Sequence, residues 1–381
     1  EVFIGSGNTY PLELGEGNTK NLSGTLVYGY RAGLVNTGAW NIAIGYDAMA
    51  ANTSGNLNTA VGNYALDGNV TGTHNTAMGH AALSYAGNMA LNVAVGFEAL
   101  TASQSSYNVA VGGYALDASN TAGYNVAVGY SAATAVTTGS VNTAVGTSSA
   151  NALTEGDHNV FIGYRAGLAT TTGDFNTIVG SNAGITQAAV SNNTFVGYNS
   201  GATTTGVQNA FFGMHSGAGV TSGVNNTAVG YLAANTADTT GGNNLVLGYN
   251  AQLDAVDDDN TVTFGDSNIA EIRCAVQTIS TLSDERDKTD IVDLDMGLAF
   301  IQRLRPVRFV WDDREEDGKH GIEETGFIAQ ELQQAQADEG KTIPRLISNS
   351  NPDKLRASEG TLLPSLVLAV QELAEKVEAI A

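Results

Sequence analysis

The residues with the clearest chemical potential are Ser283 and Lys288, which lie five positions apart in the stretch SDERDKTDI. A serine hydroxyl becomes a strong nucleophile only when a base removes its proton, and a lysine can replace histidine as that base. The lysine must be neutral to act, so burial or nearby positive charge has to lower its pKa. The spacing alone favours an N-cap serine and a solvated lysine. The alternative is a nucleophile and its base.

Charged residues around this pair act on the lysine in opposite directions. Carboxylates favour its charged form and guanidinium groups favour its neutral form. The carboxylates are Asp284, Glu285, Asp287 and Asp290, and the guanidinium groups are those of Arg286, Arg303, Arg305 and Arg308. A spacing of five does not place two side chains on one helical face. We therefore expect Ser283 in a loop or at a helix start, with a neighbouring chain as one source of further groups.

Other reactive residues do not combine into a site. The aspartates at 254, 257, 258 and 259 lack EF-hand ligand spacing, which favours a solvated loop over a Ca²⁺ site. The histidines make no cluster, and the single cysteine, Cys274, is interpreted as a small apolar residue rather than a reactive thiol. The repeats described below contain neither a nucleophile and base pair nor a carboxylate pair at one phase. We expect no metal, no cofactor and no glycan-cleaving activity there.

The density of charged residues divides the chain into two parts. Residues 1–282 hold four basic residues against seventeen acidic ones, whereas residues 283–381 hold twelve basic and twenty-one acidic residues. The net charge of −22, with no basic stripe, argues against a nucleic-acid partner. No apolar run is long enough for membrane insertion. We predict a repeat domain over 1–270, a linker over 271–282 and a charged domain over 283–381.

A repeat of about 17 residues fills the first part. Each unit contains an Asn followed four residues later by Gly, as in NTAVG, and the residue seven positions after the Asn is always small. The repeat asparagines are Asn41, Asn58, Asn75, Asn92, Asn108, Asn125, Asn142, Asn159, Asn176, Asn193, Asn209, Asn226 and Asn244. The apolar triplet between Asn and Gly is typical of a strand. It predicts a mainly β protein, a β-solenoid with two short strands per coil and a ladder of stacked Asn side chains.

Two features of the repeat leave alternatives open. The small residues could line the coil interior or an axis that several chains share. Tyrosines directly after the repeat Gly could form a packing ladder, which is favoured, or an exposed stripe for glycans; they are Tyr30, Tyr46, Tyr130, Tyr164, Tyr198, Tyr231 and Tyr249. With roughly 4.8 Å between stacked strands, some fourteen coils would make a rod about 65–70 Å long.

The charged domain is predicted to be a small α+β fold. We expect a helix from about Asp295 to Leu304, a strand after Pro306, and a short strand that leads into a helix at GFIAQELQQAQ. Apolar residues near the C-terminus recur at 363, 366, 370, 373, 377 and 380, which is heptad spacing. This seam indicates a helix bundle between chains. The alternative is an amphipathic helix packed on its own domain.

Two resemblances extend this interpretation. The NTAVG and NVAVG units resemble repeats in the heads of trimeric autotransporter adhesins, which are left-handed parallel β-rolls, and similar repeats in phage tail fibres. The segments SDERDKTDI, LRPVRFVW, TGFIAQEL and LLPSLVLAVQELAEKVE resemble the C-terminal intramolecular chaperone of endosialidase-type phage tailspikes. The second resemblance implies a domain that trimerises, assists folding of the preceding β-stalk and cuts itself off. It implies Ser283 as nucleophile, Lys288 as general base and cleavage between Leu282 and Ser283.

These observations predict the distal part of a phage tail fibre or tailspike in the virion. It would be a homotrimer that attaches to a host cell-surface glycan or receptor and carries a single-turnover serine peptidase at its C-terminus. The alternative is a bacterial trimeric surface adhesin or structural fibre with the same maturation domain. A polysaccharide-cleaving enzyme would need a catalytic domain outside this sequence.

Overall fold

The computed structural model describes residues 24–85, 87–119, 121–186, 188–266, 268–269, 271–272, 283–312, 321–348 and 355–380. The chain divides into two compact units, Glu1–Phe264 and Gly265–Ala381, and each is considered by itself. Three residues singled out by the sequence, Cys274, Leu282 and His320, lie outside the described residues.

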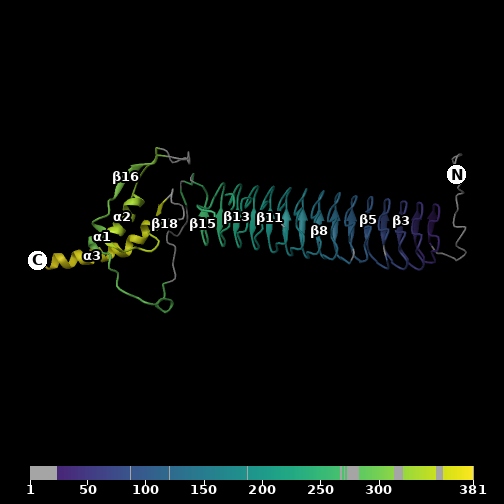
Figure 1. The fold of residues 1–381 in the computed structure, drawn as a ribbon, viewed down its shortest axis with the longest axis horizontal. Coiled ribbons are helices and arrows are strands. Elements are labelled where there is room, and N and C mark those ends of the chain that lie inside the picture. The colour runs from purple at the N-terminus through teal and green to yellow at the C-terminus, as the bar shows by residue number, and fades with distance from the viewer. Residues whose placement is uncertain are drawn as a thin grey trace. The chain divides into compact units, whose positions relative to one another are not determined.

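The first unit is a parallel β-solenoid (Figure 1). Its strands follow each other in sequence order in one fifteen-stranded sheet, and each strand is three residues long. They are β1 (Leu26–Tyr28), β2 (Ile42–Ile44), β3 (Thr59–Val61), β4 (Thr76–Met78), β5 (Val93–Val95), β6 (Val109–Val111), β7 (Val126–Val128), β8 (Thr143–Val145), β9 (Val160–Ile162), β10 (Thr177–Val179), β11 (Thr194–Val196), β12 (Ala210–Phe212), β13 (Thr227–Val229), β14 (Leu245–Leu247) and β15 (Val262–Phe264). The predicted solenoid of 17-residue repeats is confirmed.

Each coil contributes one strand to this sheet, so the expectation of two strands per coil is wrong. The rest of the coil consists of turns whose backbone groups bond to the neighbouring coils, as when the Leu66 N–H donates to the Ala82 carbonyl at 3.0 Å. Intervals of 16, 17 or 18 residues leave the strand register intact, because Val93 pairs with Val109 and Thr227 pairs with Leu245. The extra or missing residue is therefore absorbed in the turns.

The repeat Asn joins one coil to the next. The Asn41 Oδ1 accepts a hydrogen bond from the Asn58 N–H at 2.9 Å, and the Asn58 Nδ2 donates to the Gly72 carbonyl at 2.8 Å. The same pattern recurs at Asn142, whose Nδ2 donates to the Gly156 carbonyl at 2.7 Å. These amides are fully buried, where an unpaired polar group would be costly. The expected Asn ladder is confirmed.

The small residue seven positions after each Asn lies in the coil interior. Ala65, Ala99 and Ala132 are fully buried within the single chain, as is the central residue of each strand, such as Ala60. This resolves the alternative left open by the sequence in favour of the interior rather than a shared axis. The repeat Gly has a different role. At Gly146, φ is +132° and an added Cβ would stand 2.4 Å from the Gly163 carbonyl oxygen, so only glycine permits this approach of coils.

Each coil turns its corners with non-glycine residues in the left-handed region. In the coil around Asn58 these are Leu57, Tyr64 and Leu66, with φ of 60°, 60° and 53°. A side chain in this conformation costs about 1–2 kcal/mol. Burial of Leu66, which is fully enclosed, offsets that cost. Composition does not reveal these corners, because sequence rules assign such positions to glycine or asparagine.

The interior is filled by two positions that vary together. Where the central strand residue is Ala110, the residue six positions later is Leu116; where it is Phe195, the residue six positions later is Gly201. All three side chains are fully buried. A Cβ added at Gly201 would stand 2.4 Å from the Phe195 ring. A large side chain at one position therefore requires a small one at the other.

Among the described residues of the solenoid, Asp67 has the most strongly raised carboxyl pKa. Burial raises the pKa of its carboxyl to about 6, with a further contribution from the charge of Asp47 and partial relief from hydrogen bonds with the Gly68 and Asp67 N–H groups. At the equivalent position, nine residues after a repeat Asn, the Asn151 Nδ2 donates to the Ser131 carbonyl at 3.2 Å. An ionised aspartate has no proton to donate in this way.

We therefore expect Asp67→Asn to stabilise the solenoid near pH 8. The folded state holds the Asp67 proton more tightly than the unfolded state, so the contribution of Asp67 to stability is fully present below about pH 4 and is lost as pH rises through about 6. Because Asp67 is half-buried, the gain is about 1 kcal/mol. Urea midpoints at pH 4, 6 and 8 measure this, with exposed Asp238→Asn as the control. An unchanged pH dependence in Asp67→Asn would contradict the prediction.

The second unit is a small α+β domain. Its described elements are the 3₁₀ helix η1 (Glu285–Asp287), α1 (Leu298–Ile301), β16 (Val307–Val310), β17 (Glu323–Gly326), α2 (Ala329–Glu339), β18 (Ile347–Ser348), β19 (Arg356–Ala357), η2 (Glu359–Leu362) and α3 (Leu363–Glu378). β16 pairs antiparallel with β17, and β18 with β19. The core contains Met296, Phe300, Leu332, Ala335, Leu346 and Leu362.

The first helix of this domain is shorter than expected. It begins at Leu298 rather than near Asp295, because the Leu298 N–H donates to the Glu372 Oε2 of α3 at 2.6 Å. Gly297 allows this approach, since a Cβ there would stand 2.5 Å from the Glu372 carboxylate. The helix ends at Ile301, before the strand that follows Pro306.

Helix α3 turns its apolar seam away from the core of its domain. Its buried residues are Ser365 and Ala369. The exposed seam residues are Leu363, Leu366, Val370, Leu373, Val377 and Ile380. This contradicts the alternative in which the seam packs on its own domain.

Candidate functional site

The backbone between Ser283 and Lys288 folds back on itself. Asp284 caps η1, its Oδ1 accepting from the Arg286 N–H at 2.9 Å. Lys288 ends η1 in an extended conformation, with φ of −123° and ψ of 140°, and its N–H donates to the Glu285 carbonyl at 3.1 Å. One tight turn followed by an extended residue therefore brings together side chains that an α-helix would hold apart.

The turn places the serine hydroxyl and the lysine amine in contact. The Lys288 Nζ donates to the Ser283 Oγ at 2.8 Å and to the Ser283 carbonyl at 3.2 Å. The first distance lies within the range that a nucleophile and its base require for proton transfer. Ser283 precedes the helix in a loop, and Asp284 rather than Ser283 is the cap. Both Ser283 and Lys288 are exposed.

Asp284, next to the serine, is neutralised by Arg286. The Arg286 Nε and Nη2 donate to the two Asp284 oxygens at 3.0 and 2.5 Å. These bonds, with that from the Arg286 N–H, hold the pKa of Asp284 below its usual range, and they raise the pKa of Arg286. The Asp284 charge thus has its own counter-charge, which weakens its pull on Lys288.

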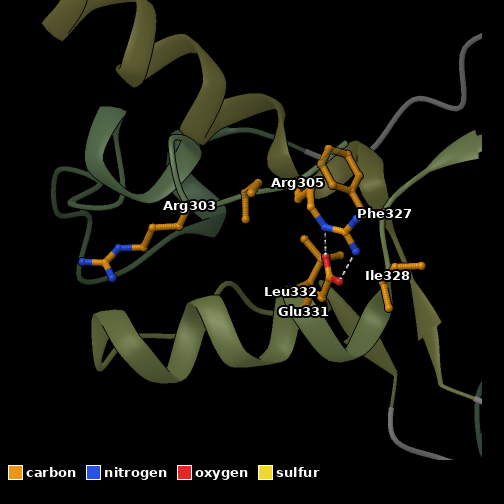
Figure 2. A pocket seen from close by; sticks show the side chains of 7 residues that line it. Arg303, Arg305, Phe327, Ile328, Glu331 and Leu332 are labelled. Carbon is orange, nitrogen blue, oxygen red and sulfur yellow. Dashed lines mark hydrogen bonds and ion pairs between the residues drawn. The ribbon is translucent and has the colours of Figure 1, made fainter. Parts of the chain in front are cut away.

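The other arginines proposed as neighbours of the lysine have acidic partners elsewhere in the domain. Arg303 pairs with Glu339 at 3.3 Å and Arg308 with Glu323 at 3.4 Å. Arg305 binds both carboxylate oxygens of Glu331, as Figure 2 shows. These hydrogen bonds lower the pKa of the Glu331 carboxyl. The small pocket beside this pair is also lined by Phe327, Ile328 and Leu332. It therefore lies between the start of α2 and the segment before β16.

Aromatic rings after the repeat Gly stack along the solenoid. Ring centroids are 5.3 Å apart for Tyr30 and Tyr46, and 5.6 Å apart for Tyr231 and Tyr249. The first row runs on through Tyr64, His80, Phe97 and Tyr114 to Tyr130. Two of the six contacts in this row are stacked and four are edge-to-face, so each ring packs on the next, which favours the packing ladder. The sequence missed Tyr64 and Tyr114, which lie one position later than the other tyrosines of this row.

One sequence expectation about acidic residues needs correction. Asp157 and Asp174 do occupy the same phase of adjacent repeats, so a carboxylate pair exists. Their Oδ1 atoms accept from backbone N–H groups of the preceding coil, Asp157 from Ser140 at 2.6 Å and Asp174 from Asp157 at 2.7 Å. The two carboxylates therefore act as side-chain links between coils.

The acidic stretch 254–259 shows a similar use of carboxylates. The Asp258 Oδ2 accepts from the Ala255 N–H at 2.9 Å, and the Asp259 Oδ1 from the Gly242 N–H at 2.6 Å. Within the described ranges, no three His, Cys, Asp or Glu side chains are grouped to hold a metal ion. None of the helices described is long and apolar enough to cross a membrane.

The chain thus combines a parallel β-solenoid with a small α+β domain in which a serine hydroxyl and a lysine amine are in contact. Residues 283–341 match the model of a peptidase family described as chaperone of endosialidase. The matched segment spans η1, both residues of the candidate pair, and the elements up to α2. Searches of curated proteins and of solved structures found no match.

The family match confirms the resemblance of the C-terminal domain to the endosialidase chaperone. It implies an autoproteolytic chaperone activity for that domain. A β-solenoid of repeats joined to such a domain fits a protein of the phage tail fibre or tailspike type.

Proposed function

We propose that this chain is the distal part of a phage tail fibre or tailspike, and that its C-terminal domain assembles the solenoid as a homotrimer and then cuts itself off. The observation that carries the proposal is the 2.8 Å contact between the Ser283 Oγ and the Lys288 Nζ inside the matched segment. The solenoid is the product of this processing, and its place is the virion.

The cleavage follows from the chemistry of this pair. A neutral Lys288 takes the proton of the Ser283 hydroxyl, and the Oγ attacks the carbonyl carbon of Leu282. The new C–O bond forms, the C–N bond to Ser283 breaks, and the lysine returns the proton to the departing amine. Water then hydrolyses the ester, which leaves a carboxylate at Leu282 and a free amine at Ser283. Each chain performs the reaction once.

Assembly provides the switch for this reaction. Lys288 is exposed to water in the single chain, and only a neutral lysine can act as a base. A neighbouring copy that covers the loop 283–288 removes water from the amine and favours the neutral form. Cleavage in this proposal therefore follows association of the C-terminal domains.

The exposed seam of α3 supports association through this helix. Leu363 is 62% exposed and Val377 is 59% exposed, although both are large apolar residues at heptad spacing. Nearly identical repeats allow copies to pair out of register by one coil at little energetic cost. A bundle of α3 helices that forms first would align the chains before the solenoids meet. Its later removal leaves a product that is kinetically trapped.

Host attachment is the biological role of the released solenoid in this proposal, with a cell-surface glycan as the class of receptor. The support is the combination of a β-solenoid with this chaperone domain, which fits proteins of the tail fibre type. Labelled mature solenoid should bind cells of the host, and soluble surface polysaccharide should compete. Equal binding to unrelated cells would contradict this role.

If cleavage traps the solenoid kinetically, cut and uncut protein should differ in their unfolding rates. We expect mature, cut protein to unfold at least about tenfold more slowly in denaturant than uncut Ser283→Ala, because the retained domain gives the uncut chains a route to re-equilibrate. Unfolding followed by far-UV circular dichroism after a jump into guanidinium measures both rates. Equal rates would show that cleavage does not trap the solenoid.

A further inference from the structure

The outward side of the fifteen-stranded sheet forms one continuous surface, which we call the outer face. It consists of the residues one and three positions after each repeat Asn, since the residue between them points into the core. On β2 to β14 these residues are Ile42, Ile44, Thr59, Val61, Thr76, Met78, Val93, Val95, Val109, Val111, Val126, Val128, Thr143, Val145, Val160, Ile162, Thr177, Val179, Thr194, Val196, Ala210, Phe212, Thr227, Val229, Leu245 and Leu247.

The residue types on the outer face are those of a protein interior. It contains no charged residue, and its only polar group is the threonine hydroxyl. Large side chains remain accessible on it, with Met78 45% exposed and Val229 41% exposed. Parallel sheets occur almost only with both faces covered. The interior of the coil covers one face of this sheet, and the side chains on the other face are half-buried or exposed.

The outer face is about as large as the largest apolar patch of a typical monomer. Its thirteen strands make twelve steps of about 4.8 Å, each about 10 Å wide along a three-residue strand, which gives roughly 580 Å². The largest apolar patch on a typical monomer is about 300–600 Å², and a standard protein interface buries about 800 Å² per partner. The residues before each repeat Asn widen this surface.

The residues that precede the repeat Asn are bulky, although their positive φ makes a bulky side chain unfavourable. Trp40, Leu57 and Val141 have φ of 54°, 60° and 62°, a conformation that asparagine adopts at lower cost. Asparagine does occupy the equivalent positions at Asn192 and Asn225. At the buried corners burial offsets the cost of a bulky residue, but Trp40 is 58% exposed. Farther along the same row, Tyr107 stacks on Tyr124 and His158 stacks on Phe175 within the single chain, so part of the cost is offset there.

The spacing of the outer face selects its occupant. A partner that contacts equivalent residues on every coil must repeat its own contacts at the spacing of parallel strands, about 4.8 Å. A folded globular surface lacks that repeat over a length of about 58 Å. A second copy of this solenoid, parallel and in register, has it along its whole length. The absence of charge on the outer face also removes the like-charge repulsion that the acidic chain would otherwise impose.

We propose that the outer face is the surface by which copies of the solenoid pack on one another, parallel and in register, with the bulky residues before Asn41 to Asn176 extending the contact. The inference rests on the proposed homotrimer and adds which side of the solenoid faces the other copies.

Single cysteines in a Cys274→Ser background test this arrangement in the full chain. Val128→Cys lies on the outer face, and Thr138→Cys lies on an exposed turn away from the strand. A short bis-maleimide should link Val128→Cys chains into covalent dimers and leave Thr138→Cys chains unlinked. In co-assembled mixtures of Val128→Cys and Val145→Cys chains, links should join like residues at least tenfold more often than unlike ones. Native mass spectrometry of the same samples reports the number of copies.

The outcomes separate this inference from the proposed function. A trimeric mass without links at Val128→Cys, or with equal links at both sites, would overturn the inference and leave the homotrimer standing. A monomeric mass would overturn both. Links mainly between unlike residues would show a register slip and overturn the in-register arrangement. As a second variant, Val128→Asp should speed amide exchange of β7 and β8 in the assembled protein, whereas Thr138→Asp should not.

Discussion

Lys288→Arg is expected to abolish self-cleavage, so that the expressed chain keeps its full mass while the wild type yields a new fragment beginning at Ser283. A guanidinium group stays protonated at all accessible pH values, so it preserves the charge and the contact with Ser283 but cannot accept a proton. Loss of a nucleophile or base in related constellations costs about 10⁴-fold or more in rate. We expect a similar loss for Lys288→Arg and for Ser283→Ala, measured by intact mass over time.

Matched variants distinguish this role from a structural one. Lys341 is a lysine of the same domain whose Nζ pairs with the Asp295 Oδ2 at 2.9 Å, so Lys341→Arg should cleave like the wild type. Ser283→Cys should retain some cleavage, because a thiol is also a nucleophile. Equal cleavage in wild type, Ser283→Ala and Lys288→Arg would rule out the pair. If Lys341→Arg lost both cleavage and the native oligomeric mass, this would show that the domain tolerates no change of this kind.

Much of the solenoid could be predicted from the sequence, because the residues that recur in every repeat each have one structural role. An Asn that recurs in every repeat and a Gly that never varies are the parts that bond and approach the next coil, as Asn58 and Gly146 do. The number of strands per coil could not be predicted. The second half of each coil turns at left-handed positions held by residues such as Leu66, whose type gives no local signal of that conformation.

The candidate pair was predictable as residue types, and its geometry was not. Helical spacing argues against contact between residues five apart. The contact exists because a three-residue 3₁₀ turn is followed by an extended Lys288, a combination set by the cap at Asp284. Arg286, which pairs with Asp284, lies only two residues from it in the sequence. The carboxylates that pair with Arg303 and Arg305 come from α2 and could not be assigned without the tertiary fold.

The core of the solenoid provides the second large expected effect. Phe195 is fully buried and stacks on Phe211 with ring centroids 5.0 Å apart. Phe195→Ala should destabilise the solenoid by about 3–5 kcal/mol, because the vacated space is lined by packed side chains that cannot close it. Gly201→Leu alone should also destabilise it, by at least about 1–3 kcal/mol, since its Cβ would stand 2.4 Å from the Phe195 ring.

The two substitutions together should recover most of that loss. Phe195→Ala with Gly201→Leu recreates the pairing of Ala110 with Leu116, and Leu116 already adopts φ of 51° at the equivalent corner. The double variant should lie within about 2 kcal/mol of the wild type, the remainder reflecting the lost stacking on Phe211. Urea midpoints of all four proteins measure the coupling. Destabilisation of the double variant equal to the sum of the single variants would show that the two positions do not share one space. Recovery would show that each coil fills a fixed interior volume, which is why the solenoid accepts either pairing while its strand register stays constant.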